Sequence, residues 1–220
     1  HVQTCDTARF EGEKVALARE VDRIAREFSR EVRQVRATWS ESLRRIEVAA
    51  HPGVFVREEQ TYCVLAVQAV AGDDGGLTMG YESAGGTEGL EFLDGGVPKL
   101  LARKAAGRAV RALRAAKLPG GRMPVVLSSE AGGTMVHEAV GHGLEADLAR
   151  RGMSVYKEKP GERIGSPLVS IADDATIPGK RGSYGIDDEG TSGQRTLLVD
   201  GGILKGFLHD RLSAMKDGYP

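Results

Sequence analysis

The spacing of two histidines near the middle of the chain is the feature that most constrains its fold. His137 is followed directly by Glu138, and His142 comes five positions after the first histidine. On a regular helix, residues five apart are separated by about 140° around the axis and ~7.5 Å along it, too far for both imidazoles to reach one ion. We therefore expect a locally widened turn of the π-bulge kind, with Gly141 as its position.

Two histidines with a glutamate beside the first are typical of a zinc peptidase site. The imidazoles hold the metal, and the carboxylate takes a proton from the metal-bound water. We interpret His137 and His142 as metal ligands and Glu138 as the general base. Each histidine alone could be an ordinary core or surface residue, but the glutamate after the first and the glycine before the second favour metal binding.

Two more carboxylates, Glu145 and Asp147, follow the motif closely. Either could orient a ligand histidine, supply a carboxylate ligand or be an ordinary acid on a helix surface, and the residues alone leave these roles open. The glycine-rich turn at Gly132–Gly133 could also cradle a phosphate. No Gly-Lys-Ser/Thr sequence accompanies it, so a phosphate site is disfavoured.

The motif and its flanks resemble the TldD/PmbA family. The resemblance is carried by the segments Val125–Leu127, Glu130–Gly133, His137–Asp147 and Gly185–Thr191. That family comprises cytoplasmic prokaryotic metallopeptidases, historically labelled modulators of DNA gyrase, whose TldD-type subunit carries the HExxxH motif. Its third metal ligand is a cysteine in the C-terminal part, and no cysteine follows Cys63 here. The resemblance thus implies either a fragment that stops before the third ligand or an incomplete site.

The same resemblance implies a function. A TldD-type peptidase would hydrolyse flexible or unfolded peptides with Zn²⁺ as its cofactor, and Glu138 would act on the metal-bound water. It would work as a dimer, or as a heterodimer with a TldE/PmbA-like subunit that lacks the motif. Because both histidines are intact, the chain resembles the catalytic member. If the cysteine-bearing part is absent, the polypeptide would have the family's fold without activity.

The competing hypothesis is a non-enzymatic protein that modulates DNA gyrase or associates with DNA. Its support is a basic helix without acidic residues, with cations at Arg103, Lys104, Arg108, Arg111, Arg114 and Lys117. A solvated basic face is the simpler interpretation, since apolar residues at helical spacing would pack the other face, namely Leu101, Ala105, Val110 and Leu113. The whole chain has 30 basic and 31 acidic residues, which disfavours nucleic acid as the main partner.

Composition sets the broad class. A chain of 220 residues can form one large or two small domains with a real core. Only two cysteines are present, Cys5 and Cys63, which favours a reduced, cytoplasmic protein without disulfides. No apolar run approaches the ~20 residues of a membrane span, and we identify no signal peptide. The first residue is not methionine, and both ends look cut.

Apolar side chains recur at helical spacing from Glu11 to Phe28 and then at every second residue, which predicts a helix followed by strands. The strand-like segments are 35–39, 46–48, 54–57, 62–70 and 77–83. We expect the first two to form a hairpin turning near Ser40–Ser42, and another turn at Asp73–Gly76. Pro98 then begins a helix that runs to Leu118, before a Pro-Gly-Gly break.

The predicted fold class is α+β, with two domains. Residues 1–118 form an antiparallel sheet with helices on one face. Residues 122–220 form the start of a metallopeptidase domain, β-rich and carrying the HExxxH helix. For this second part we expect a strand over 123–127, a helix N-cap at Thr134, a strand over 168–172, a hairpin turning at Asp200–Gly202 and a short helix capped by Asp210.

The remaining candidate residues are assigned structural roles. Three histidines have no acidic or cysteine residues grouped with them and are interpreted as ordinary residues without a metal: His1, His51 and His209. The two cysteines, Cys5 and Cys63, are interpreted as small buried apolar residues. The acidic run Asp187–Glu189 lacks the alternating spacing of calcium ligands and is interpreted as a solvated loop. The surrounding segment, 180–194, either lies over a peptide-binding cleft or is disordered.

Overall fold

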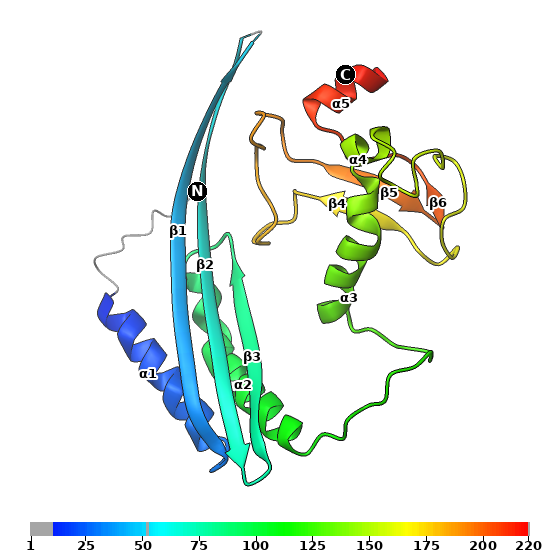
Figure 1. Ribbon diagram of the computed structural model, residues 1–220. Coiled ribbons are helices and arrows are strands. Elements are labelled where there is room, and N and C mark those ends of the chain that lie inside the picture. The colour runs from blue at the N-terminus through cyan, green and yellow to red at the C-terminus, as the bar shows by residue number, and fades with distance from the viewer. Residues whose placement is uncertain (1–10, 52, 220) are drawn as a thin grey trace. The chain divides into compact units, whose positions relative to one another are not determined.

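The computed structural model describes residues 11–51 and 53–219, so the candidates His1 and Cys5 lie outside the described part (Figure 1). The chain divides into two compact units, of which the first comprises His1–Pro119 and Ile177–Tyr184, and the second Gly120–Thr176 and Gly185–Pro220. Among the described helices, none combines the length and the apolar character needed to cross a bilayer.

The sheet of the first unit is an antiparallel meander, as predicted, but the five strand-like segments form only three strands, in the order β1-β2-β3. Its strands are β1 (Val32–Ala50), β2 (Val54–Asp73) and β3 (Gly76–Gly86). The turn between β2 and β3 lies where Asp73 pairs with Gly76. Only the β2 segment Cys63–Asp73 pairs with β3, so the rest of the long β1–β2 hairpin extends as two strands.

The prediction of a hairpin turn near Ser40–Ser42 is wrong. Ser40 pairs with Val64 inside an unbroken β1, and the chain reverses only between Ala50 and Val54. Residues 40–42 contain serine, which favours turns only weakly, but no glycine, proline, asparagine or aspartate, which favour chain reversal more strongly. At the real turn, Gly53 adopts φ 73°, a left-handed conformation that glycine reaches without strain.

Two helices, α1 (Glu11–Glu27) and α2 (Val97–Leu113), cover one face of this sheet, as predicted (Figure 1). A 3₁₀ helix, η2 (Leu90–Gly96), precedes α2. Alternate residues of β2 enter the core together with Val21 and Ala25 of α1 and with the apolar face of α2, a set that includes Leu65, Val67, Ala69, Ala71, Leu101, Ala105 and Val110. The predicted apolar face of α2 is thereby confirmed.

Helix α2 begins as predicted, with Pro98 in its first turn, but it ends at Leu113 instead of Leu118. Residues 115–118 are good helix formers, yet they have no core to pack on, and Leu118 is 80% exposed. In addition, Pro119 disfavours helical geometry at the residue before it. Propensity alone therefore overestimates the length of this helix.

The second unit contains a series of helical turns, a small antiparallel sheet and a terminal helix. Its elements are α3 (Ser129–Val136), η3 (His137–Gly141), η4 (His142–Leu144), α4 (Ala146–Arg150), β4 (Ile171–Asp174), β5 (Arg195–Asp200), β6 (Ile203–Leu204) and α5 (Arg211–Asp217). The strand order is β4-β5-β6, and Leu144, Leu198, Val199 and Leu204 form the core. Together with the first unit, this confirms the α+β class.

Two local predictions in the second unit are confirmed. Asp200 pairs with Ile203, so Gly201 and Gly202 form the two-residue turn of a hairpin, both with positive φ. Asp210 is the N-cap of α5, and its carboxylate accepts a 2.7 Å hydrogen bond from the backbone N–H of Ser213.

Three other local predictions are wrong or shifted. Residues 123–127 form no strand, since they have no strand partner in the described part of the chain and the side chain of Val126 is 99% exposed. The motif helix begins at Ser129, so Thr134 lies inside it and is not its N-cap. The strand predicted over 168–172 starts only at Ile171, because it forms where pairing with β5 begins.

Gly80 of β3 lets α2 approach the sheet closely. A Cβ atom at this position would meet the carbonyl oxygen of Ala105 and would lie 2.6 Å from the backbone nitrogen of Ala109. We predict that Gly80→Ala lowers the free energy of unfolding by roughly 1–3 kcal/mol, because helix backbone cannot yield as a flexible side chain can. The matched control is Gly12→Ala in α1, where a Cβ atom would meet nothing within 4 Å apart from its chain neighbours and the backbone of its own helix. Urea unfolding monitored by circular dichroism measures both, and equal stability of the two variants would contradict the prediction.

Candidate metal centre

The widened turn predicted from the histidine spacing is present. Residues His137–Gly141 form a π-helical turn, in which the backbone N–H of His142 donates to the carbonyl of His137, five residues earlier. The extra residue is thereby accommodated within one turn, and the two rings meet edge to face with their centroids 4.5 Å apart. The predicted distortion is confirmed, and it ends at Gly141.

The π turn brings three side chains with metal-binding atoms together. One ligand atom each from His137, Glu138 and His142 lies within 4.8 Å of the others, and all three side chains are exposed. Glu138 Oε2 lies 3.9 Å from His142 Nε2. Two imidazole nitrogens with a carboxylate oxygen are a donor set that zinc accepts. These residues therefore fit a zinc ion.

A second carboxylate contacts His142 from the other side of its ring. Glu145 Oε1 lies 2.6 Å from His142 Nδ1. This hydrogen bond and the negative charge of Glu145 raise the pKa of His142 above its ordinary value. With Nδ1 engaged, Nε2 is the nitrogen that faces Glu138. Of the roles left open for Glu145, the contact favours orientation of the histidine.

Asp147, the other open candidate, has a different neighbour. Its carboxylate lies 3.7 Å from the guanidinium of Arg151, one turn further along, and both side chains are largely exposed. Such a pair contributes little to stability. The geometry favours an ordinary surface acid at Asp147.

The end of the motif is attached to the core of the second unit. Leu144, two residues after His142, is fully buried. Tyr156 lies against Gly143, where a Cβ atom would come within 2.7 Å of its ring, and Ser154 Oγ donates to the carbonyl of Gly143. Close packing on a glycine and a buried leucine therefore fix the backbone that carries His142. The sequence gives no signal for Ser154 or Tyr156, because they lie in an irregular run without periodicity.

The acidic run has a structural role. Asp187 Oδ1 accepts hydrogen bonds from the backbone N–H groups of Glu189 and Thr191, and Glu189 Oε2 accepts one from the N–H of Arg211. Segment 185–193 is thus held in a defined turn. Asp187 and Glu189 also line a groove of about 290 Å³ together with Glu145, Asp147, Leu208, His209, Asp210 and Ser213.

The remaining structural assignments agree with the geometry. His209 is largely buried, and burial lowers its pKa. Cys63 is fully buried in β2, while His51 is exposed. None of these three side chains belongs to the His137–Glu138–His142 cluster.

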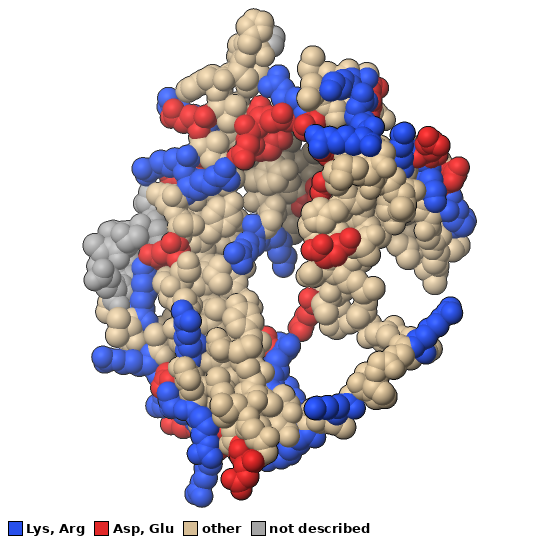
Figure 2. All heavy atoms as spheres, viewed as in Figure 1, with Lys and Arg blue, Asp and Glu red and all other residues tan. Residues whose placement is uncertain are grey.

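Cations of α2 and of its C-cap residue, Arg114, pair with acids from other elements. Arg108 pairs with Glu82 of β3, and Arg114 Nη2 lies 2.6 Å from Glu31 Oε1. Figure 2 shows basic and acidic side chains interspersed on the face in view, without a continuous basic surface. The structure thus favours an ion-paired, solvated helix over a nucleic-acid interface.

Comparison with known proteins places both units in one family of domains. Residues 8–113 match the model of the PmbA/TldA metallopeptidase central domain, and residues 120–220 match that of the C-terminal domain. A metalloprotease from Methanocaldococcus jannaschii is 44% identical over 162 residues, which cover 74% of this chain and 36% of the relative. A metalloprotease TldD homolog from Haemophilus influenzae is 37% identical over 206 residues, which cover 91% of this chain and 43% of the relative. The chain spans less than half the length of these relatives.

Solved structures show the same fold. A protein from Thermotoga maritima, solved as a candidate modulator of a DNA gyrase, superposes with a TM-score of 0.84 at 24% identity, covering 96% of this chain and 48% of its own. TldE from Thermococcus kodakarensis superposes with a TM-score of 0.67 at 18% identity, and the superposition covers 93% of this chain and 46% of TldE.

The contact between Glu145 and His142 generates a prediction. We expect Glu145→Ala to weaken zinc binding about 10–100-fold, because the imidazole loses the partner that sets its orientation. The matched control is Asp147→Asn, which alters a nearby acid that pairs with Arg151 and should leave zinc affinity within about twofold. Competition for zinc with a chromophoric chelator measures both affinities. Equal losses in the two variants would indicate a general effect of negative charge and contradict the orienting role.

Proposed function

The chain belongs to the PmbA/TldD metallopeptidase family, and we propose that it carries the metal ligands and the general base of a TldD-type zinc peptidase that hydrolyses flexible or unfolded peptides. The observation that carries this proposal is the π turn, which brings His137, Glu138 and His142 within reach of one ion. The Haemophilus relative, named a metalloprotease TldD homolog, supports it.

Each residue of the cluster has a proposed role. His137 and His142 hold the zinc ion, and Glu145 orients His142. When bound, zinc polarises a carbonyl oxygen and lowers the pKa of water towards about 7. Glu138 accepts the proton of the attacking water and passes it to the leaving amine. Its exposed carboxylate adjoins both imidazoles, as this role requires.

The third ligand is proposed to come from outside these 220 residues. No cysteine follows Cys63, and the family resemblance assigns the third position to a cysteine. The relatives are more than twice as long as the part matched here, which supports a ligand from another part of the polypeptide or from a second chain. Until that ligand is present, the 220 residues alone would hold zinc weakly and be inactive.

The partner and the domain boundary complete the proposal. A TldE/PmbA-like subunit would form a heterodimer with the TldD-type chain, and the likeness of this fold to TldE supports related subunits. Residues 1–118 and 122–220 are proposed as separate domains, which agrees with the extents of the two matched domain models. A DNA-binding function is not proposed, since acids offset several cations of α2.

The metal site can be tested by zinc content. We predict that the C-terminally extended chain, purified without chelator, contains zinc that is lost in its His137→Ala, His142→Ala double variant, because each imidazole supplies one bond. Elemental analysis per chain measures this. If a C-terminally extended chain contains no more zinc than its own double variant, the metal site is refuted.

The general base is tested by Glu138→Gln in the full-length protein with its partner subunit. We predict a loss of peptide hydrolysis by at least about 10²-fold with unchanged zinc content, since the amide cannot accept the proton. Glu130→Gln on α3, the exposed helix that directly precedes the π turn, is the control and should retain activity. Cleavage of an unfolded, fluorescently labelled peptide measures the rates, and an active Glu138→Gln variant would disprove the assigned role.

A further inference from the structure

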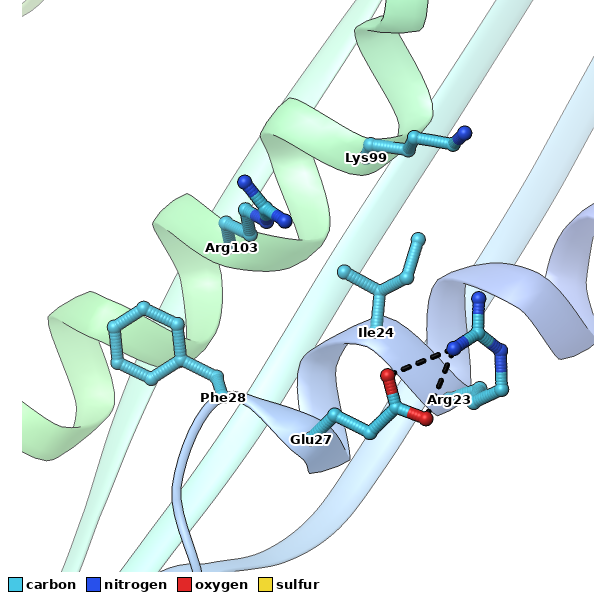
Figure 3. A pocket seen from close by; sticks show the side chains of 6 residues that line it. All are labelled: Arg23, Ile24, Glu27, Phe28, Lys99 and Arg103. Atoms are coloured by element: carbon cyan, nitrogen blue, oxygen red, sulfur yellow. Dashed lines mark hydrogen bonds and ion pairs between the residues drawn. The ribbon is translucent and has the colours of Figure 1, made fainter.

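A groove in the first unit, far along the sequence from the metal motif, has the lining of a binding site. It lies between α1 and α2, has a volume of about 540 Å³ and is lined by Arg23, Ile24, Glu27, Phe28, Lys99 and Arg103 (Figure 3). Three of these residues are basic and one is acidic, so the lining has an excess of positive charge. Its volume lies within the range of ligand sites.

Arg103 is the cation that remains available to a ligand. It makes no hydrogen bond or ion pair with the residues that the structure describes, whereas Arg23 contacts both carboxylate oxygens of Glu27, at 2.9 and 2.7 Å (Figure 3). Lys99 pairs loosely with Glu20, at 3.4 Å, and its side chain is 62% exposed. A planar guanidinium such as that of Arg103 binds a carboxylate with two parallel hydrogen bonds.

An apolar surface adjoins these cations. Phe28 follows the end of α1 and its side chain is 45% exposed, with Ile24 one turn before it. The ring lies against Gly107 of α2, where a Cβ atom would come 3.1 Å from Phe28 Cζ. Because Gly107 is four residues after Arg103, the aromatic ring and the guanidinium occupy successive turns of one helix face.

The spacing of the cations matches an extended peptide. Lys99 and Arg103 are four residues apart on α2, a rise of ~6 Å. Alternate side chains of an extended peptide are spaced by ~6.6 Å and lie on the same side. Two carboxylates at alternate positions would therefore meet the two cations. Nucleic acid gains its affinity from many phosphate contacts, and this short groove offers few.

We propose that the groove between α1 and α2 binds an acidic segment of an extended peptide, with two carboxylates at Arg103 and Lys99 and an apolar side chain against Phe28 and Ile24. The identification of this peptide as a substrate rests on the proposed peptidase function. The groove would then select acidic, unfolded segments independently of the residues that perform hydrolysis.

Peptide affinity tests the groove directly. The probe is a fluorescein-labelled peptide with two glutamates two positions apart and a neighbouring phenylalanine, added to the chain carrying Glu138→Gln so that no cleavage occurs. We expect Arg103→Gln to weaken binding at least tenfold by fluorescence anisotropy. Arg19→Gln, which removes an exposed cation of α1 outside the groove, is the matched control and should change affinity less than twofold.

Substitutions in the peptide and the protein separate the two kinds of contact. Lysine in place of both glutamates should abolish binding, and Phe28→Ala should weaken it several-fold while circular dichroism shows an unchanged fold. Equal losses for Arg103→Gln and Arg19→Gln, no binding of the acidic peptide, or tighter binding of a labelled single-stranded DNA would each overturn the proposal.

Failure of the peptidase proposal can be distinguished from failure of the groove proposal. If the acidic peptide binds through Arg103 but the full-length protein with intact Glu138 never cleaves any peptide, the groove stands and the peptidase proposal falls. If peptides are cleaved while Arg103→Gln changes neither binding nor KM, the groove is refuted and the peptidase stands.

Discussion

The hydrogen bond from the N–H of His142 to the carbonyl of His137 is the interaction on which the candidate metal site depends. It closes a turn of five residues instead of four, and this rotates the second imidazole back towards the first. A regular helix would leave the rings on different faces. The cost of the irregular turn is offset nearby, where buried Leu144 and the contact between Tyr156 and Gly143 hold the following residues in place.

Glycine has a related role in both units, because it lets two elements approach more closely than a Cβ atom would allow. Gly80 places β3 directly beneath the backbone of α2, and Gly107 accepts the ring of Phe28. In the second unit Gly143 accepts Tyr156. These contacts explain why positions without side chains determine where a helix, an aromatic ring and a candidate ligand lie.

Charged side chains are arranged differently in the two units. Around His142, carboxylates face an imidazole, an arrangement that favours a metal cation and a bound proton. On α2 and at its C-cap, Arg108 and Arg114 pair with acids, whereas Arg103 has no such partner among the described residues. A nearly neutral chain can thus combine a candidate site for a cation with a groove whose lining has an excess of basic residues.

The sequence by itself determined features that depend on local spacing: the α+β class, the widened turn at His137–Gly141, the glycine turn after Asp200 and the cap at Asp210. Only the tertiary structure decided the rest. The alternation of apolar and polar residues looks the same whether a strand reverses or continues. Only the pairing of β1 with β2 shows that β1 continues past Ser40. The apolar segment 123–127 has no strand partner in the described chain, and the contacts of Glu145 and Phe28 depend on distances that no spacing encodes.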